Sequence, residues 1–342
     1  MAIGGKLRVV LLASMFAGSG LAALAAQAPT GRIGQPNPRA GAFLNVYDTP
    51  AIHIATAERI AGSDLRSVFR LCGTVQVPPV TNNTAEPAKI FDNLYWLGIP
   101  SVSAWAITTS EGIIVIDSLD NAREAETYIE GGLRKLGLNP NDIKYVVITH
   151  AHTDHFGGAQ YLANKFGAAL VMSETDWDVL SRAQPPANPN PSRGPIPRRG
   201  TGVPDGFRLS LGGTTIEMIQ TPPHTPGAIS LIFDVRDGAA RHVAGLWGAI
   251  GFNFQQNEAN YTKYAESVDK YAAIAKARGV DVPLANHPNF DLAMEKIAAL
   301  RTRANGAPHT FVTGAETQSR IFDVQTECAL AGRAKLRAAE AR

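Results

Sequence analysis

The most informative feature of the sequence is a group of side chains of the kinds that bind metal ions. The segment His-Ala-His-Thr-Asp-His, which begins at His150, contains three imidazoles and one carboxylate. It follows an apolar run at 145–149 that is predicted to be a buried strand. In extended backbone His150 and His152 point to the same side, and a turn after them would bring Asp154 and His155 to an adjacent position. Four potential ligands therefore crowd one end of a strand.

Two more histidines lie where predicted strands end and turn-forming residues begin. His224 stands in Thr-Pro-Pro-His-Thr-Pro-Gly, and His287 directly precedes a proline. Imidazole nitrogen and carboxylate oxygen suit Zn²⁺, which they bind at about 2.0–2.2 Å. Five histidines and one aspartate are enough for two zinc ions with three protein ligands each, and open positions on each ion are typical of a catalytic site. The remaining histidines, His53, His242 and His309, lack such neighbours and are predicted to be ordinary core or surface residues.

The elements that must position these residues alternate between short apolar runs and helical patterns, which indicates an α/β (α+β) fold. Asn121 is predicted to cap a helix, and a Pro-rich loop at 185–206 is long enough to cover a site as a flap. Strands are predicted at 94–97, 104–108, 113–116, 145–149, 214–219, 229–234, 242–246 and 282–285, and further helices at 53–71, 260–278, 291–304 and about 316–340.

Composition and the N-terminus exclude several classes of protein. The 342 residues are 45% hydrophobic and carry a net charge of +2, and only two are cysteine. This balance argues against nucleic-acid binding, and two cysteines exclude a disulfide scaffold or an iron–sulfur protein. Residues 1–28, with Lys6 and Arg8 before a short apolar run and Ala-x-Ala sites, resemble a signal peptide. We therefore expect a periplasmic or secreted protein with no membrane contact after cleavage; its oligomeric state is left open.

The strand that ends at Asp117, the His-x-His-x-Asp-His segment, the turn around His224 and the late His287 together resemble the metallo-β-lactamase superfamily over about residues 90–305. The resemblance implies a four-layer αβ/βα sandwich with a dinuclear site at one edge, between the sheets. It also implies that Asp117 supports the metal-binding loop without being a ligand. The expected organisation is a signal peptide at 1–28, an N-terminal extension at 29–90, a metallo-hydrolase domain at 91–305 and a C-terminal helical segment at 306–342.

The stretch 242–248 contains neither the Asp nor the Cys that other branches of the superfamily carry there. The chain therefore looks like the third subclass of class B (zinc) β-lactamases. The resemblance implies that one zinc ion is held by His150, His152 and His224, and the other by Asp154, His155 and His287. A hydroxide bridging the two ions would attack the amide of a small-molecule antibiotic, and Asp154 would accept a hydrogen bond from that hydroxide and help to move the proton.

Two other functions stay open: an exported zinc hydrolase of another ester, lactone or amide, and a non-catalytic zinc-binding module. The segment from Gly245 to Phe252 has no hydroxyl or cation for a β-lactam carboxylate, and Trp247 and Phe252 are predicted to form an apolar wall for the substrate. We therefore expect weak β-lactam hydrolysis with a high KM, unless Asn253 or an arginine from 193–199 binds the carboxylate.

The two cysteines allow two interpretations. Cys328 lies at helical spacing among apolar residues, so it could be a buried free thiol. In an exported protein it could instead pair with Cys72 and join the extension to the C-terminal helix.

Overall fold

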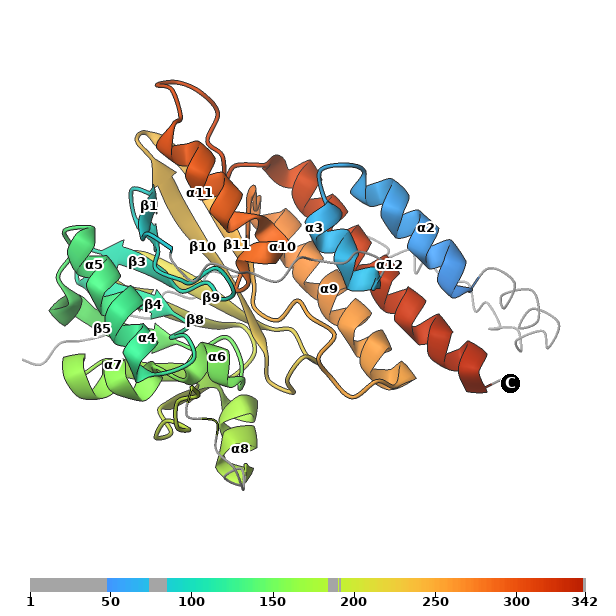
Figure 1. Ribbon diagram of the computed structural model, residues 1–342, viewed down its shortest axis with the longest axis horizontal. Helices are drawn as coiled ribbons and strands as arrows, with labels where there is room; N and C mark the ends of the chain where they lie inside the picture. Colours follow the sequence, from blue (N-terminus) through green and yellow to red (C-terminus); the bar gives the residue numbers. More distant parts are fainter. Residues whose placement is uncertain (1–47, 74–84, 184–189, 191, 341–342) are drawn as a thin grey trace, which may run out of the picture. The chain divides into compact units, whose positions relative to one another are not determined.

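The computed structural model describes residues 48–73, 85–183, 190 and 192–340, all of which belong to one compact unit. The predicted signal peptide at 1–28, the leader that follows it and part of the 185–206 loop lie outside the described residues. Two β-sheets stand at the centre of this unit, with helices on both sides (Figure 1). No helix among the described residues is long and apolar enough to cross a membrane.

The first sheet contains seven strands in chain order. β1 to β4 pair antiparallel, and β4 to β7 pair parallel. Its strands are β1 (Ala88–Phe91), β2 (Leu94–Trp96), β3 (Trp105–Thr109), β4 (Gly112–Ile116), β5 (Ile143–Val147), β6 (Ala169–Ser173) and β7 (Thr201–Val203).

The second sheet contains five strands in the order β12-β11-β10-β9-β8. All of its pairs are antiparallel except β11 with β12. Its strands are β8 (Phe207–Leu211), β9 (Thr214–Gln220), β10 (Ile229–Asp237), β11 (Ala240–Trp247) and β12 (Val282–Ala285).

The helices form the two outer layers and the connections. They are α2 (Pro50–Ala61), α3 (Arg66–Phe69), η1 (Arg70–Cys72), α4 (Ala122–Glu124), the π-helical η2 (Ala125–Glu130), α5 (Gly131–Lys135), η3 (Pro140–Asp142), α6 (Thr153–Phe156), α7 (Ala159–Phe166), α8 (Glu174–Arg182), α9 (Glu258–Arg278), α10 (Pro288–Asp291), α11 (Ala293–Arg301) and α12 (Gly314–Glu340).

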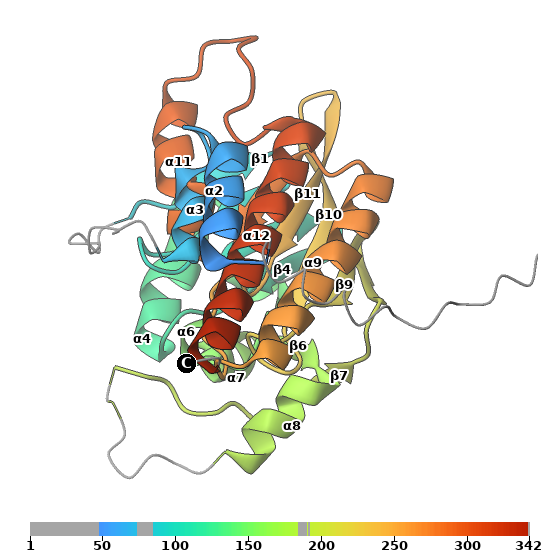
Figure 2. The same ribbon diagram turned by 90° about the vertical axis from the view of Figure 1, so that its right-hand side faces the viewer.

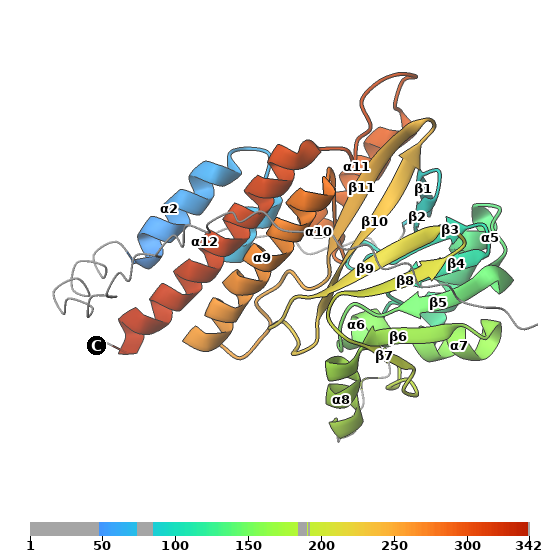
Figure 3. The ribbon, with the colours of Figure 1, turned by 180° about the vertical axis from the view of Figure 1, so that it is seen from behind.

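Strand β4 explains why the sheets are covered on both faces. Its side chains alternate between two cores: Ile114 and Ile116 pack between the sheets, whereas Ile113 and Val115 pack beneath the helices from α4 to α7. A strand that is apolar on both faces must be buried on both. The second sheet is covered in turn by α9 and α12 on its outer face (Figure 3). The result is the four-layer αβ/βα sandwich predicted from the sequence.

The N-terminal and C-terminal helices form one bundle, in which α2, α12 and α9 lie side by side (Figure 2). Thr49 caps α2, and Gly62, with a φ of 57°, ends it. The single helix predicted at 53–71 is therefore wrong: the chain breaks after Ala61 and resumes as α3. A disulfide bond joins Cys72 to Cys328 of α12, which decides between the two interpretations of the cysteines.

Candidate metal centre

The six predicted ligands lie beyond the ends of strands at one edge of the two sheets, four in loops and two, Asp154 and His155, in α6. The loops follow β5, β9 and β12, so both sheets contribute. One connection between the sheets is direct: the backbone N–H of Ile229 in β10 donates to the backbone oxygen of Thr149, 2.9 Å away. At the same point Gly248 lies against Ile229, where a Cβ would be only 1.9 Å from the carbonyl oxygen of Ile229. Only glycine fits there, and the loops of the two sheets are thereby held close together.

The first group consists of His150, His152 and His224. The Nδ1 atom of His152 is 3.1 Å from Nε2 of His150 and 3.0 Å from Nε2 of His224. Three nitrogens bound to a tetrahedral zinc ion at about 2.0–2.1 Å are separated by about 3.3–3.4 Å. The three imidazoles thus converge at a spacing close to that of one bound metal ion.

The second group consists of Asp154, His155 and His287. The Oδ2 atom of Asp154 lies 3.3 Å from Nε2 of His155 and 3.8 Å from Nε2 of His287. The two groups are neighbours, since the rings of His150 and His155 have centroids 4.1 Å apart. The structure therefore brings the six residues together in the two sets of three that the resemblance implies.

Four of the five imidazoles are oriented by hydrogen bonds from the nitrogen that faces away from the site. Each donates Nδ1–H to a protein oxygen, at 2.6–2.9 Å, and so leaves the lone pair of Nε2 free to bind a metal ion. The donor–acceptor pairs are His150 with the Gly248 carbonyl, His224 with the Gly251 carbonyl, His287 with the Ser101 carbonyl and His155 with Asp117.

The charges around the two groups differ. Burial, with the neighbouring imidazoles, lowers the pKa of His150 well below its usual value and that of His224 to about 3. Burial would also lower the pKa of His155, but the carboxylates of Asp117 and Asp154 outweigh it and raise that pKa to about 10. Burial likewise opposes ionisation of Asp154, yet the charge of His155 holds its pKa well below the usual range. The first group therefore presents neutral nitrogens, and the second concentrates negative charge.

Asp117 occupies the supporting position that the resemblance implies. It is fully buried, and its Oδ1 accepts the backbone N–H of Thr149 at 2.8 Å. Its Oδ2 accepts the Thr149 hydroxyl at 2.9 Å and Nδ1–H of His155 at 2.8 Å. Asp117 therefore fixes both the start of the metal-binding loop and the tautomer of His155.

Sequence reasoning missed a second buried carboxylate, Asp176 of α8. Its oxygens accept the backbone N–H of Ala151, the backbone N–H of Gly227 and the hydroxyl of Thr225. It thereby ties the 150–152 loop to the loop that carries His224. The only local signal is that Ser173 caps α8 on the backbone N–H of Asp176; nothing in the sequence indicates the contacts with the two loops.

The backbone around the motif differs from the extended conformation expected for it. Strand β5 ends at Val147, and the backbone N–H of His152 bonds to the carbonyl of His150 at 3.0 Å, so the two residues lie in a turn. The ring nitrogens converge because the chain folds back, and not because alternate strand residues share a face. His152 then serves as the first residue before α6, which carries Asp154 and His155.

The predicted apolar wall is wrong for Trp247. Its neighbour Leu246 packs between the sheets, so alternation along β11 turns Trp247 to the opposite face, where it is 3% exposed among Tyr264, Tyr271 and Phe322. Phe252 packs its ring on Tyr264 in the same aromatic cluster. Neither residue belongs to the two groups of metal-binding residues.

An arginine from the 193–199 segment does lie at the metal edge. Nη1 of Arg193 is 2.5 Å from Oδ1 of Asp120 and 3.6 Å from Oδ1 of Asp154. The backbone N–H of Gly194 bonds to the carbonyl of Asp120, which fixes this segment against the loop after β4. The guanidinium remains half-exposed. Of the proposed flap, residues 201–203 are strand β7 and not loop, and 184–189 and 191 lie outside the described residues.

The donor set fits metal ions. Nε2 of His155 is buried and makes no well-formed hydrogen bond among the described residues, although the Asp154 carboxylate faces it at 3.3 Å; a nitrogen in this position is costly unless something else binds it. Nitrogen and carboxylate oxygen are donors that suit zinc. Each of the two groups of three could therefore hold a metal ion.

Comparison with known proteins agrees with this geometry. Residues 97–239 match the family model described as the metallo-beta-lactamase superfamily. A hydroxyacylglutathione hydrolase from Acidiphilium cryptum is 28% identical over 130 residues, which are 38% of this chain and 44% of that protein. The chain spans about half the length of the curated relatives it matches.

Solved structures match over a larger part of the chain. A native metallo-β-lactamase from Legionella gormanii has a TM-score of 0.62 at 24% identity, over 78% of this chain and all of the other. A subclass B3 metallo-β-lactamase of Bradyrhizobium japonicum has a TM-score of 0.55 at 27% identity, over 75% of this chain and 94% of the other.

Proposed function

Because the chain belongs to the metallo-β-lactamase superfamily, we propose that it is an exported hydrolase that uses two zinc ions to open the amide bond of β-lactams. The observation that carries this proposal is the set of four imidazoles with Nδ1–H bound to protein oxygens and Nε2 directed at the two groups. Such orientation is typical of metal ligands. The lack of Asp or Cys at 242–248 supports the third subclass of class B enzymes.

The residues of the site have distinct roles in this proposal. When bound, zinc lowers the pKa of water to about 7 and so supplies a nucleophile at neutral pH. Asp117 accepts Nδ1–H of His155 and so directs Nε2 of that ring toward the metal site. The ionised carboxylate of Asp154 accepts a hydrogen bond from the attacking water and helps to move its proton toward the leaving nitrogen. Arg193 binds the carboxylate of the substrate, because its half-exposed guanidinium lies beside Asp154 and offers donors in a planar fork.

Export is supported by two features. Residues 1–28 have the pattern of a signal peptide, and the Cys72–Cys328 disulfide suits an oxidising compartment such as the periplasm.

The test is hydrolysis by the mature protein of a penicillin, a cephalosporin, a carbapenem, an N-acyl homoserine lactone, an acyl-glutathione thioester and a simple ester. Each substrate is tested with and without chelator and after zinc is restored. We expect zinc-dependent β-lactam hydrolysis that chelator abolishes and added zinc restores. Two zinc ions per chain by elemental analysis are expected, and a preparation that is active with a single bound ion would contradict the two-ion site.

A matched pair of variants tests the role of Asp154. Asp154→Asn should keep the first ion and lose at least about 100-fold in turnover, because the second ion loses its only carboxylate and the proton loses its carrier. Asp142→Asn, at an exposed position of η3, should keep both ions and full turnover. Near-normal turnover in Asp154→Asn would remove Asp154 from the mechanism.

A second candidate function is hydrolysis of another ester, lactone or thioester. It is favoured by the segment from Gly245 to Phe252, which has no hydroxyl or cation, and whose carbonyls at Gly248 and Gly251 are occupied by metal-site imidazoles. Turnover of the lactone or thioester without β-lactam turnover would establish this alternative. Two bound ions without turnover of any substrate would indicate a non-catalytic module.

A further inference from the structure

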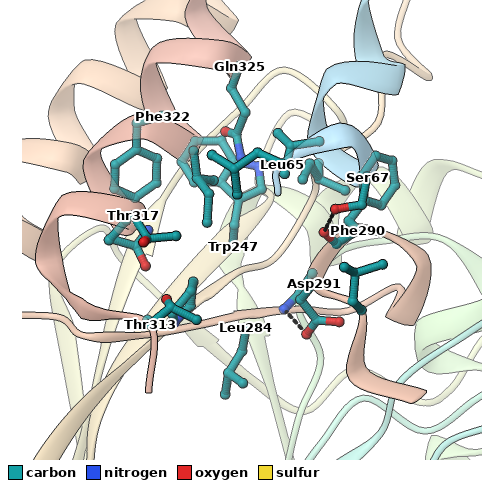
Figure 4. Close-up of a pocket in the computed structure, with 18 of the residues that line it drawn as sticks. Leu65, Ser67, Trp247, Leu284, Phe290, Asp291, Thr313, Thr317, Phe322 and Gln325 are labelled. Atoms are coloured by element: carbon teal, nitrogen blue, oxygen red, sulfur yellow. Dashed lines mark hydrogen bonds between the residues drawn. The ribbon is translucent and has the colours of Figure 1, made fainter. Parts of the chain in front are cut away.

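A cavity of about 180 Å³ lies between the helical bundle and the second sheet (Figure 4). Its walls come from α3, α10, α12 and the ends of β11 and β12. Most of the lining is apolar and includes the side chains of Leu65, Val68, Trp247, Leu284, Phe290 and Phe322. The cavity is larger than the roughly 150 Å³ in which an apolar site binds a benzene-sized molecule. None of the six metal-binding residues lines it.

The cavity also contains buried polar groups without partners. Gln325 of α12 is completely buried, and neither its amide nitrogen nor its amide oxygen has a hydrogen-bond partner among the described residues. Figure 4 shows its side chain extending from the helix toward Trp247 and Leu65. Oε1 of Gln318, which is 5% exposed, and Oγ1 of Thr313 also lack partners in the described part of the chain. A buried amide is stable only when something bonds to it.

Two ionisable side chains lie at one end of the cavity. Asp291 is partly buried, and its oxygens accept the backbone N–H groups of Ala285 at 2.8 Å and Ala293 at 3.0 Å. Lys296, the other charged group lining that end, is also partly buried. Burial raises the pKa of Asp291 and lowers that of Lys296, so charged groups are disfavoured at this end, and the carboxylate already accepts two backbone N–H groups. An uncharged molecule therefore suits the cavity better than an anion or a cation.

We propose that this cavity is a binding site for a small uncharged molecule that combines an apolar ring or branched chain with a primary amide. The amide of the ligand pairs with that of Gln325 through two hydrogen bonds, one donated by each partner. Oε1 of Gln318 can accept the second N–H of the ligand, and the hydroxyl of Thr313 can donate to its carbonyl oxygen. The apolar part fills the space between Trp247 and Phe290. Such a ligand bonds to the polar atoms and also covers the apolar wall. Water could bond to the polar atoms but would leave the apolar wall hydrated.

The first test uses benzamide as the probe, with benzoate and acetophenone as matched compounds. Binding to the mature, disulfide-bonded protein is measured by titration calorimetry, and the site is located in crystals soaked with benzamide. Benzamide should bind in the cavity. Acetophenone, which cannot donate, should bind about tenfold more weakly, and benzoate weaker still. Failure of benzamide to bind, or crystals in which the cavity holds only water, would overturn the proposal.

Variants then connect binding to the cavity. Thr317→Phe, on the cavity wall, should abolish benzamide binding by filling the space, whereas Ser319→Phe, at an exposed position of the same helix, should leave it unchanged. Gln325→Leu should remove the preference for benzamide over acetophenone while both still bind. This third variant keeps the proposal testable if Thr317→Phe does not fold. Unchanged benzamide affinity in Thr317→Phe, or an unchanged preference in Gln325→Leu, would overturn the proposal.

Discussion

Asp117 contributes both to metal binding and to the stability of the fold. Replacing it by Asn, with a matched control, should measure the two contributions separately. Asn tolerates the backbone of residue 117, which has a φ of 60°. The amide, however, has only one accepting oxygen. If that oxygen keeps the backbone N–H of Thr149, the amide nitrogen faces Nδ1 of His155 and donates to it. The proton of His155 must then move to Nε2, the atom that should bind the metal ion.

The expected losses follow from these contacts. Loss of the partner that orients a metal-binding histidine weakens metal affinity by about 10- to 100-fold, which is about 1.4–2.8 kcal/mol. If the amide instead turns its oxygen to His155, the buried N–H of Thr149 is left unpaired at a cost of about 1–3 kcal/mol in stability. The second metal equivalent should therefore weaken, while the first, held by three other imidazoles, stays bound.

Asp176→Asn is the matched control. Asp176 is equally buried and also accepts three hydrogen bonds, but none of them comes from an imidazole. Its loss of about 1–3 kcal/mol in the free energy of unfolding should be similar, without a selective loss of the second equivalent. Urea unfolding of the metal-free proteins gives the first quantity, and titration of zinc against a competing chelator gives the second. The reasoning is refuted if Asp117→Asn binds its second ion like the wild type, or if both variants lose that ion equally.

Three further outcomes are expected. Arg193→Ala should raise KM for β-lactams about tenfold with little change in kcat, because it removes a contact with the substrate carboxylate. Arg198→Ala, at another exposed position of the same segment, is the control. Equal kinetics of the two variants would contradict the binding of the substrate carboxylate by Arg193. Burial raises the pKa of Asp291 to about 7, above its unfolded value of 3.8, so the folded protein becomes less stable as the pH rises from about 4 to about 7 and this carboxyl ionises. The Asp291→Asn variant does not ionise there, and its free energy of unfolding relative to the wild type should increase by up to about 4 kcal/mol over the same range. Urea unfolding at pH 4 and pH 7 measures this, and an equal difference between the two proteins at both pH values would argue against it. The double variant Cys72→Ser/Cys328→Ser should lose about 2–5 kcal/mol in the free energy of unfolding, and a wild-type protein whose unfolding is insensitive to reductant would contradict this.

Much of the metal site could be predicted because its ligands lie close together in the sequence or beside turn-forming residues. His150, His152, Asp154 and His155 fall within six positions, and their residue types alone restrict the chemistry. The partners of Asp176 are 25 and more positions away, and only the folded sheets bring them into contact.

Trp247 shows a different limit of sequence reasoning. An aromatic side chain near a predicted strand end can point to either face of the sheet. If the alternation is displaced by one residue, a side chain expected in the substrate site lies in the core instead. The disulfide likewise depended on tertiary structure, because the pairing of Cys72 with Cys328 requires η1 and α12 to be neighbours.

The disulfide has a topological consequence for the whole molecule. It joins positions 256 residues apart, so both sheets and all six metal-binding residues lie within one covalently closed ring, and the two ends of the chain leave that ring at the same place. A protease that cuts once anywhere inside the ring opens it without releasing a fragment. The nicked protein should migrate as one species in a non-reducing gel and as two after reduction, and the severed halves can re-associate at the high effective concentration that the bond maintains.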